Sequence, residues 1–174
     1  KCHLLDIELI LNIARYYCEN GCHSKALILC DELLSDDDNI TPEQKTSVLF
    51  QKGEIYFLLG DVDIAIKEFN QCLALSPNKA LTREANEYIA CCHIKLGNID
   101  DAVRAVHAMI IESKDNRSIA EALAWIGDIY LNGKRFVDAS KAFTEANNLK
   151  EVHSDIKARI TYSLGVCYMK QNFK

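Results

Sequence analysis

Proline and glycine are scarce in this sequence, which has 2 prolines and 7 glycines among 174 residues. A collagen-like chain and a turn-rich β-sandwich both need these residues often, so their scarcity argues against both classes. The sequence also lacks any stretch close to about 18 consecutive apolar residues, so no membrane-spanning helix is predicted. We therefore expect a soluble, helical protein without a membrane partner.

The chain begins Lys1-Cys2-His3, without an initiator methionine or a signal-peptide core, so we expect a fragment of a longer protein. Positive charge is also in short supply, because 20 Lys and Arg face 25 Asp and Glu, for a net charge of −5. Binding to a phosphate backbone depends on Lys and Arg, so no nucleic acid partner is expected. The 8 cysteines lie in apolar segments of a chain too long to need disulfides, which favours reduced thiols and a cytoplasmic or nuclear location.

The sequence does contain an internal repeat. Residues 53–56 (GEIY) recur as 127–130 (GDIY) and 165–168 (GVCY), at separations of 74 and 38 residues, and 90–93 (ACCH) lies midway in the first interval. A looser copy stands at residues 14–17 (ARYY), and a turn-forming pair follows each of the first four copies, at residues 21–22, 60–61, 97–98 and 132–133. A fixed period of this size indicates stacked units that each contain a helix, a tight turn and a second helix.

The best copy, residues 46–79, resembles the tetratricopeptide repeat (TPR) family, whose unit reads W-x2-L-G-x2-Y, then A-x3-F, then P. The matching residues are Leu49, Lys52, Gly53, Tyr56, Ala65, Phe69 and Pro77. The fourth copy keeps the same pattern except for the proline, and the others are looser. The period of 37 to 39 residues exceeds the family's usual value of about 34, and the surplus falls near residues 78–82 and 114–117.

The resemblance implies an all-α, right-handed superhelical solenoid of helix-turn-helix repeats. We expect a single domain over residues 1–174, with repeats at about 7–40, 46–79, 83–116 and 120–153 and a partial repeat at 158–174. Thr41 and Gln44 are predicted to form a helix-capping box, and so are Ser118 and Glu121. No polar helix follows the last copy, so we expect further sequence to cap the array.

In TPR arrays the first helix of each repeat lines the concave face, which implies a partner-binding groove along this chain. The groove residues are expected to be Phe50, Glu54, Phe57, Glu87, Cys91, Ile94, Asp128 and Leu131. Their apolar and acidic character predicts a partner peptide or helix with apolar anchors and basic residues. Alternatively, Phe50 and Phe57 pack between repeats and the carboxylates are ordinary solvated charges. A carboxylate clamp for acidic chaperone tails is not expected, because Arg15, Glu54 and Cys91 stand where the family's clamp has asparagine.

Catalytic motifs are missing: the sequence has no phosphate-binding glycine loop, no G-x-S-x-G and no H-E-x-x-H. We therefore predict no enzyme activity and no cofactor. Cys18, Cys22, His23 and Cys30 have part of the spacing of a zinc site. Because Cys30 takes the family's buried aromatic place, these groups are not expected to converge, and no metal is predicted.

The predicted function is a non-catalytic protein–protein interaction scaffold, as part of a multiprotein complex. Two alternatives stay open. The apolar N-terminal stretch, residues 3–13, could form a homodimer interface that makes the chain an assembly module. The chain could also be the regulatory arm of an enzyme or transcription regulator whose effector lies outside it.

Overall fold

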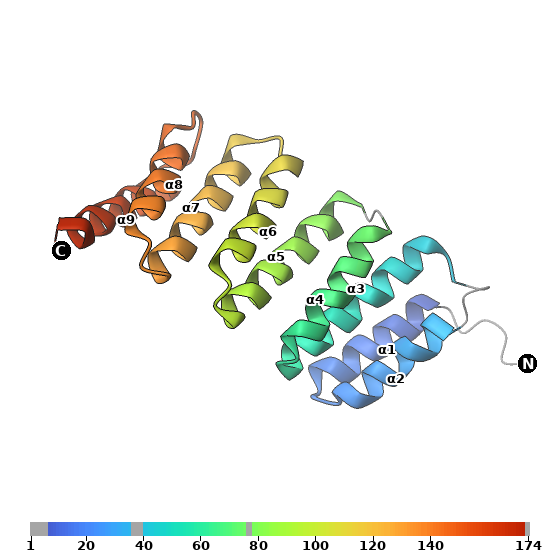
Figure 1. Cartoon of the computed structure of the whole chain (residues 1–174). Coiled ribbons are helices and arrows are strands. Elements are labelled where there is room, and N and C mark those ends of the chain that lie inside the picture. The colour runs from blue at the N-terminus through green and yellow to red at the C-terminus, as the bar shows by residue number, and fades with distance from the viewer. Residues whose placement is uncertain (1–6, 36–39, 76–77, 173–174) are drawn as a thin grey trace, which may run out of the picture. The chain divides into compact units, whose positions relative to one another are not determined.

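The computed structural model describes residues 7–35, 40–75 and 78–172, which form nine helices and no strand (Figure 1). The helices are α1 (Ile7–Glu19), α2 (His23–Ser35), α3 (Pro42–Leu59), α4 (Val62–Ala74), α5 (Lys79–Leu96), α6 (Ile99–Glu112), α7 (Asn116–Asn132), α8 (Phe136–Asn148) and α9 (Ser154–Asn172). The predicted all-α class of helix-turn-helix repeats is confirmed. Within these ranges, no helix is long and apolar enough to cross a membrane. Pro77 and the start of the apolar N-terminal stretch, residues 3–6, lie outside the described residues.

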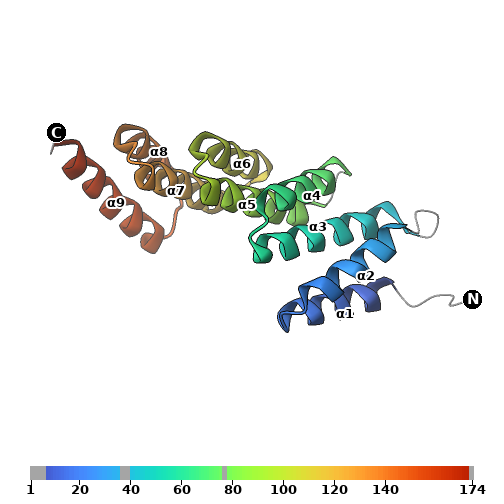
Figure 2. The same ribbon diagram turned by 60° about the horizontal axis from the view of Figure 1, so that its bottom comes forward.

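The chain divides into two compact units, an N-terminal unit (Lys1–Cys92) and a C-terminal unit (His93–Lys174). In the N-terminal unit, α1 pairs with α2 and α3 pairs with α4, and α2 also packs on α3 (Figures 1 and 2). In the C-terminal unit, α7 pairs with α8, and both α6 and α9 pack against this pair. The N-terminal unit is therefore built from two stacked hairpins, and the C-terminal unit from one hairpin with a helix packed on each side.

The tight turns lie where the sequence predicts them. The first three contain a glycine in the left-handed region, and at Gly60 φ is 87°. The α7–α8 turn differs, because Lys134 has the positive φ (59°) while Gly133 has a φ of −75°. Gly133 has another role, since a Cβ there would lie 3.0 Å from Cδ1 of Ile99. Its missing side chain lets the turn approach the start of α6.

In the repeats after the first, the surplus residues lengthen the first helix of the hairpin. The first helices α3, α5, α7 and α9 have 18, 18, 17 and 19 residues, whereas the second helices α4, α6 and α8 have 13 or 14. Residues 79–82 and 116–117 are thus the first turns of α5 and α7. At the start of α5, the side chain of Asn78 accepts a hydrogen bond of 3.0 Å from the backbone N–H of Leu81, which stabilises the added turn.

One of the two predicted capping boxes is confirmed and the other is wrong. At α3, the Thr41 hydroxyl accepts from the N–H of Gln44 at 3.2 Å, and the Gln44 side chain accepts from the N–H of Thr41 at 3.0 Å. At α7, the cap is Asp115, whose carboxylate accepts from the N–H of Ser118 at 2.8 Å. Ser118 therefore lies inside the helix, because an extended Asp115 with an acceptor side chain is available three residues earlier.

Two glycines let the helices of a hairpin approach closely. A Cβ at Gly53 would lie 2.6 Å from the ring of Phe69, and a Cβ at Gly127 would lie 2.6 Å from the ring of Phe143. Both rings are buried, at 0% and 1% exposure. The Gly and Phe of the repeat are therefore two halves of one packing contact between first and second helix.

This contact predicts opposite effects for the same substitution at different repeats. Gly53→Ala should lower the free energy of unfolding by about 1–3 kcal/mol, because the buried ring of Phe69 has no space into which to move. Gly165→Ala should instead raise it by up to about 1 kcal/mol, since a Cβ there meets nothing within 4 Å and alanine favours a helix. Urea unfolding of both variants checks the prediction, and equal effects of the same sign would contradict it.

Candidate partner-binding face

The N-terminal unit contains predicted groove residues on α3 and α5, and α1 lies beside α3. Glu54, on α3, is half-buried and accepts a hydrogen bond of 2.9 Å from the hydroxyl of Tyr88, on α5. Arg15, on α1, acts on the same carboxylate electrostatically and is exposed. Glu54 is thus the centre of a polar group to which three successive first helices contribute.

Electrostatics make Glu54 an unusual carboxylate. Burial raises the pKa of Glu54 above its ordinary value, and the Tyr88 hydrogen bond and the charge of Arg15 offset only part of this effect. The charge of Glu84 adds to the rise. A carboxylate that is partly desolvated and has another acid nearby gains from a basic partner group, because that group would stabilise its ionised form.

The aromatic residues of this unit divide into a buried part and an accessible part. Phe50 is only 8% exposed, and its ring contacts the rings of Phe69 and Tyr88 at centroid distances of 5.5 and 5.8 Å. Phe57 is half-buried, and its ring lies 5.3 Å from that of Tyr88. Phe50 therefore supports the face from below, as the packing alternative predicts, whereas Phe57 and Tyr88 reach the surface.

The remaining predicted residues of the N-terminal unit lie on α5. Glu87 is exposed. Cys91 is half-buried and close enough to Tyr88 to contribute to the rise of the tyrosine's pKa. Together with Glu54, Phe57 and Tyr88 they form what we call the acidic face. Its members combine half-buried aromatic surface with carboxylates.

In the C-terminal unit the other three predicted residues have separate surroundings. Ile94 is 39% exposed near the end of α5, and Leu131 is half-buried on α7. Asp128, also on α7, is half-buried and lies 3.9 Å from the guanidinium of Arg159, on α9. Burial raises the pKa of Asp128, and Arg159 opposes that rise. The structure thus pairs Asp128 with a cation of its own unit.

Tyr88 is the member of the acidic face that the sequence pattern did not single out. It lies between the family positions Asn86 and Ile89 and belongs to a degenerate repeat. One signal was available, because Trp125 stands 37 residues later at the same repeat position. Both repeats therefore place a large aromatic residue where Gln51 stands in the best copy.

The cysteines are free thiols in the part of the chain that the structure describes. Sγ of Cys18 lies 3.7 Å from Nδ1 of His23, but Cys30 is fully buried, as predicted, and burial raises its pKa to about 12. A thiol with so high a pKa is a poor thiolate ligand at neutral pH. Over the described residues, no three His, Cys, Asp or Glu side chains are grouped to hold a metal ion.

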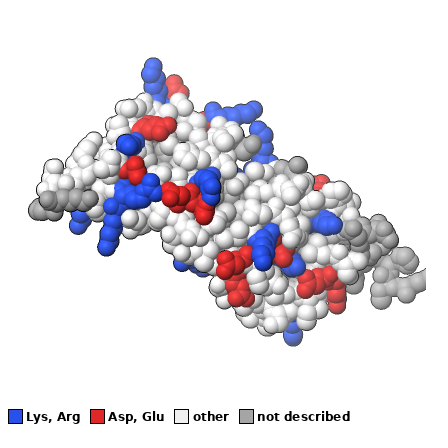
Figure 3. Space-filling model, in the orientation of Figure 1, with Lys and Arg blue, Asp and Glu red and all other residues white. Residues whose placement is uncertain are grey.

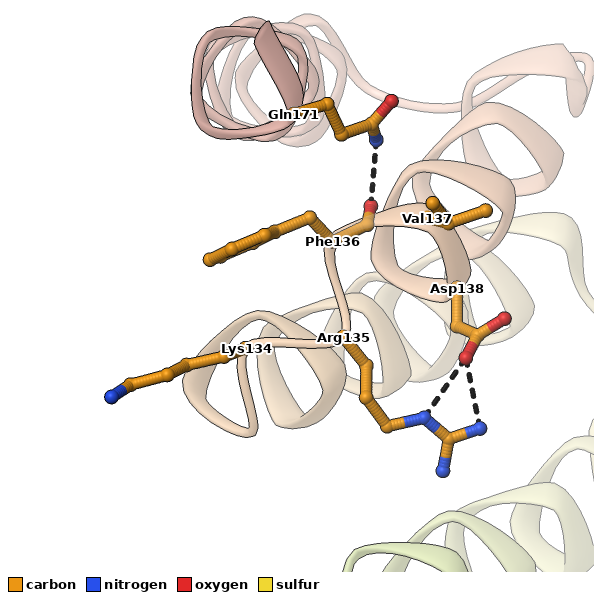
Figure 4. A pocket seen from close by; sticks show the side chains of 6 residues that line it. All are labelled: Lys134, Arg135, Phe136, Val137, Asp138 and Gln171. Atoms are coloured by element: carbon orange, nitrogen blue, oxygen red, sulfur yellow. Dashed lines mark hydrogen bonds and ion pairs between the residues drawn. The ribbon is translucent and has the colours of Figure 1, made fainter. Parts of the chain in front are cut away.

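Charge is mixed on the surface, without a large patch of one sign on the face that Figure 3 draws. The C-terminal unit has a pocket of about 260 Å³ at the α7–α8 turn (Figure 4). Arg135 and Asp138 form an ion pair of 2.8 Å there, and Gln171 donates a hydrogen bond of 2.9 Å to the carbonyl of Phe136. The Gln171 hydrogen bond connects the start of α8 to α9.

The raised pKa of Glu54 predicts how stability depends on pH. A folded-state pKa above the unfolded one contributes stability at low pH, which is lost as the pH rises through the folded-state pKa. Glu54→Gln keeps an acceptor for Tyr88 and removes the ionisation, so it should be more stable than wild type at pH 7 and equal to it below about pH 4. Urea unfolding across this pH range checks the difference, with the exposed Glu87→Gln as control. A variant less stable than wild type at pH 7 would show that the charge of Glu54 is needed for folding.

The comparisons with known proteins agree with this geometry. Residues 47–79 match the family model described as tetratricopeptide repeat. Among curated proteins, none matches the sequence. Solved structures match along nearly the whole chain. A MamA protein has a TM-score of 0.69 at 18% identity, covering 95% of this chain and 82% of that one. BtubC from P. vanneervenii has 0.71 at 16%, covering 95% and 73%.

A third solved structure is a putative kinesin light chain from Podosopora anserina with nearly identical TPR-like repeats, with a TM-score of 0.68 at 14% identity, covering 97% of this chain and 88% of that one. Identities this low establish the fold alone. The tetratricopeptide-repeat fold suggests a scaffold for protein–protein interaction. Residues 47–79 are thus a tetratricopeptide repeat, and the chain as a whole has the fold of tetratricopeptide-repeat proteins.

Proposed function

We propose that this chain is a non-catalytic scaffold within a multiprotein complex and that its acidic face binds a peptide or helix with apolar anchors and basic side chains. The observation that carries the proposal is Glu54, a half-buried carboxylate at the surface of three adjacent first helices. Burial of this carboxylate has a cost that Arg15 and the Tyr88 hydroxyl offset only in part, and groups perturbed in this way are concentrated at functional sites. A Lys or Arg of the partner would add a further positive charge beside Glu54.

The surroundings of Glu54 fit such a partner. Phe57 and Tyr88 offer half-buried aromatic surface for an apolar anchor, and Glu87 adds an exposed carboxylate on the same helix as Tyr88. Anchors supply most of the affinity of an interface, whereas charge complementarity sets register and association rate. In the C-terminal unit, Ile94, Asp128 and Leu131 are proposed as further contacts of the same chemical kind.

The test begins with selection of peptides from a random display library on the immobilised chain. The selected peptides should combine apolar residues with Lys or Arg. Their affinity for the double variant Glu54→Lys, Phe57→Ala should be at least about 10-fold weaker, a loss of about 1.4 kcal/mol, measured by fluorescence anisotropy. Glu87→Lys should also weaken binding, and the weakening should shrink at high salt.

Asp63→Lys on α4 is the matched control, because it makes the same charge change at an exposed position of a second helix. It should leave the affinity unchanged, and circular dichroism should show equal helicity for all variants. Selected peptides rich in Asp and Glu would contradict the proposal, and so would equal losses at Glu87 and Asp63.

A second candidate function is self-association, because α1 exposes large apolar side chains. Leu9, Ile13 and Tyr16 are 48%, 37% and 62% exposed and share one side of the helix at spacings of four and three residues. Light scattering should then show a dimer that Leu9→Glu with Tyr16→Glu converts to a monomer. A wild-type monomer at high micromolar concentration would exclude this candidate.

A further inference from the structure

Two first helices have a carboxylate at the same repeat position, Glu54 on α3 and Asp128 on α7, 74 residues apart. Both carboxylates are half-buried, and burial raises the pKa of each. Asp128 lies 3.9 Å from the guanidinium of Arg159, which comes from the next first helix of its unit, α9. The C-terminal unit therefore supplies its own cation to this carboxylate, and the cation is an arginine.

The N-terminal unit has an acid where this arginine stands. Glu84 on α5 lies 75 residues before Arg159, just as Ala90 on α5 lies 75 residues before Gly165 on α9. The charge of Glu84 raises the pKa of Glu54 instead of lowering it. Arg15 on α1 has the opposite effect, but in the described part of the chain it forms no ion pair with Glu54. Glu54 is thus without the close cation that its counterpart has.

The carboxylate of Glu54 is held in a fixed orientation by Tyr88, whose hydroxyl donates to Oε1 at 2.9 Å. The ring of Tyr88 stacks on that of Phe69 at 5.1 Å, and it meets the rings of Phe50 and Phe57 edge-on at 5.8 and 5.3 Å. Burial and the charge of Glu54 raise the pKa of Tyr88, so the phenol remains a donor at neutral pH. Because three rings hold the phenol, its hydroxyl fixes the position of Oε1.

The other carboxylate oxygen, Oε2 of Glu54, is open to solvent. It accepts no hydrogen bond from the described residues, and it is not one of their buried unpartnered atoms. Phe57, three residues later on α3, adds half-buried ring surface on the same side of the helix. A guanidinium suits such a site, because its planar fork matches a carboxylate, it stacks on aromatic rings, and it is more weakly hydrated than an ammonium.

We infer that the acidic face selects arginine over lysine, with a partner guanidinium that meets Glu54 as Arg159 meets Asp128. The inference rests on the proposed binding function and names the cation that this function leaves open. The hydroxyl of Tyr88 has a positioning role, because it acts on the partner through Glu54. Lysine is the weaker ligand, since a point charge makes no second hydrogen bond to a fixed carboxylate.

The test uses two peptide display libraries that differ at one central position, which is fixed as Arg in one and as Lys in the other. All other positions are random but exclude Arg, Lys and His. The wild-type chain should enrich peptides from the Arg library. The best of them, remade with Lys or with the uncharged citrulline in place of Arg, should bind at least about 10-fold more weakly in fluorescence anisotropy.

Three variants of the chain locate this selectivity. Glu84→Arg places a guanidinium where Arg159 stands in the other unit, so it should weaken the Arg peptide at least about 10-fold and lower the pKa of Glu54 in carboxyl-carbon NMR. Asp63→Arg, the same charge change at an exposed position of α4, should do neither. Tyr88→Phe keeps the ring and removes the hydroxyl, so the ratio of Lys-peptide to Arg-peptide dissociation constants should fall towards one. Circular dichroism should show equal helicity for all three.

The outcomes separate this inference from the function on which it rests. Peptides that lose affinity with Glu54→Gln but bind equally with Lys and Arg overturn the inference and leave the proposed function standing. Equal affinity of the Arg peptide for Glu84→Arg and Asp63→Arg also overturns the inference. If neither library yields a peptide, or if Glu54→Gln weakens none, the proposed function fails and the inference fails with it.

Discussion

Phe69→Ala should lower the free energy of unfolding by about 3–5 kcal/mol, the usual range for removing a fully buried phenylalanine. Phe69 has no exposed surface, and its ring lies over Gly53. The same ring stacks on Tyr88 at a centroid distance of 5.1 Å and meets Phe50 edge-on at 5.5 Å. The substitution therefore removes a contact within the hairpin and a contact with the next first helix together. Urea unfolding followed by circular dichroism measures the loss.

Two further variants separate these contributions. Phe69→Leu keeps most of the volume over Gly53 and should lose less than Phe69→Ala. In the background of Phe69→Ala, the added change Gly53→Ala should no longer be destabilising, because the ring that it meets at 2.6 Å is gone. If both changes of this pair lower stability additively, the close approach of ring and glycine does not carry the packing energy.

Lys52→Ile should also be strongly destabilising, by about 3–5 kcal/mol, because it leaves a buried carboxylate without its cation. The side chains of Lys52 and Glu68 are each only 12% exposed, and Nζ of Lys52 lies 3.4 Å from Glu68 and 2.9 Å from Asp31. Burial alone would lower the pKa of Lys52, but the hydrogen bond to Asp31 and the charge of Glu68 outweigh it, so its pKa is raised. The folded state thus keeps this lysine charged.

The rest of the chain shows how this loss can be reversed. At the position of Lys52 the other repeats have Ile or Leu, and at the position of Glu68 they have Leu or Ala. The double variant Lys52→Ile, Glu68→Ala should therefore regain most of the stability lost by Lys52→Ile, since apolar replacement of a whole buried ion pair is often neutral. Chemical denaturation of the two single variants and the double variant checks this. A double variant that falls to the sum of the single losses would contradict it.

The sequence contained the signal for this ion pair, although the repeat pattern did not use it. Both charged residues are exceptions at positions that are otherwise apolar, one on the first helix and one on the second helix of the same hairpin. Opposite charges at two such positions compensate each other only if the two side chains meet. Single-residue propensities do not contain this information, because each charge by itself is compatible with a solvated helix face.

For the candidate face, too, the sequence pattern predicted one part and the packing of the helices decided the rest. The repeat register assigned Glu54, Phe57 and Phe50 to one groove, but the structure leaves Glu54 and Phe57 half-buried and buries Phe50. Position on a helix fixes only the direction of a side chain. Whether that direction ends in solvent depends on the neighbouring helix, and for Phe50 the neighbour is the ring of Tyr88. The same limit applies to Ser118, which a better-placed acceptor displaced as the helix cap.

The sequence by itself determined the all-α class, the hairpin repeat, the turns and the cap at Thr41, because these depend on local spacing and on residues that lie within a few positions of one another. Only the tertiary structure decided that Lys52 bridges two helices, that Tyr88 holds Glu54, and that Gly165 lacks the ring that covers its counterparts. Each of these depends on side chains from different helices, and such pairings arise only when the hairpins pack.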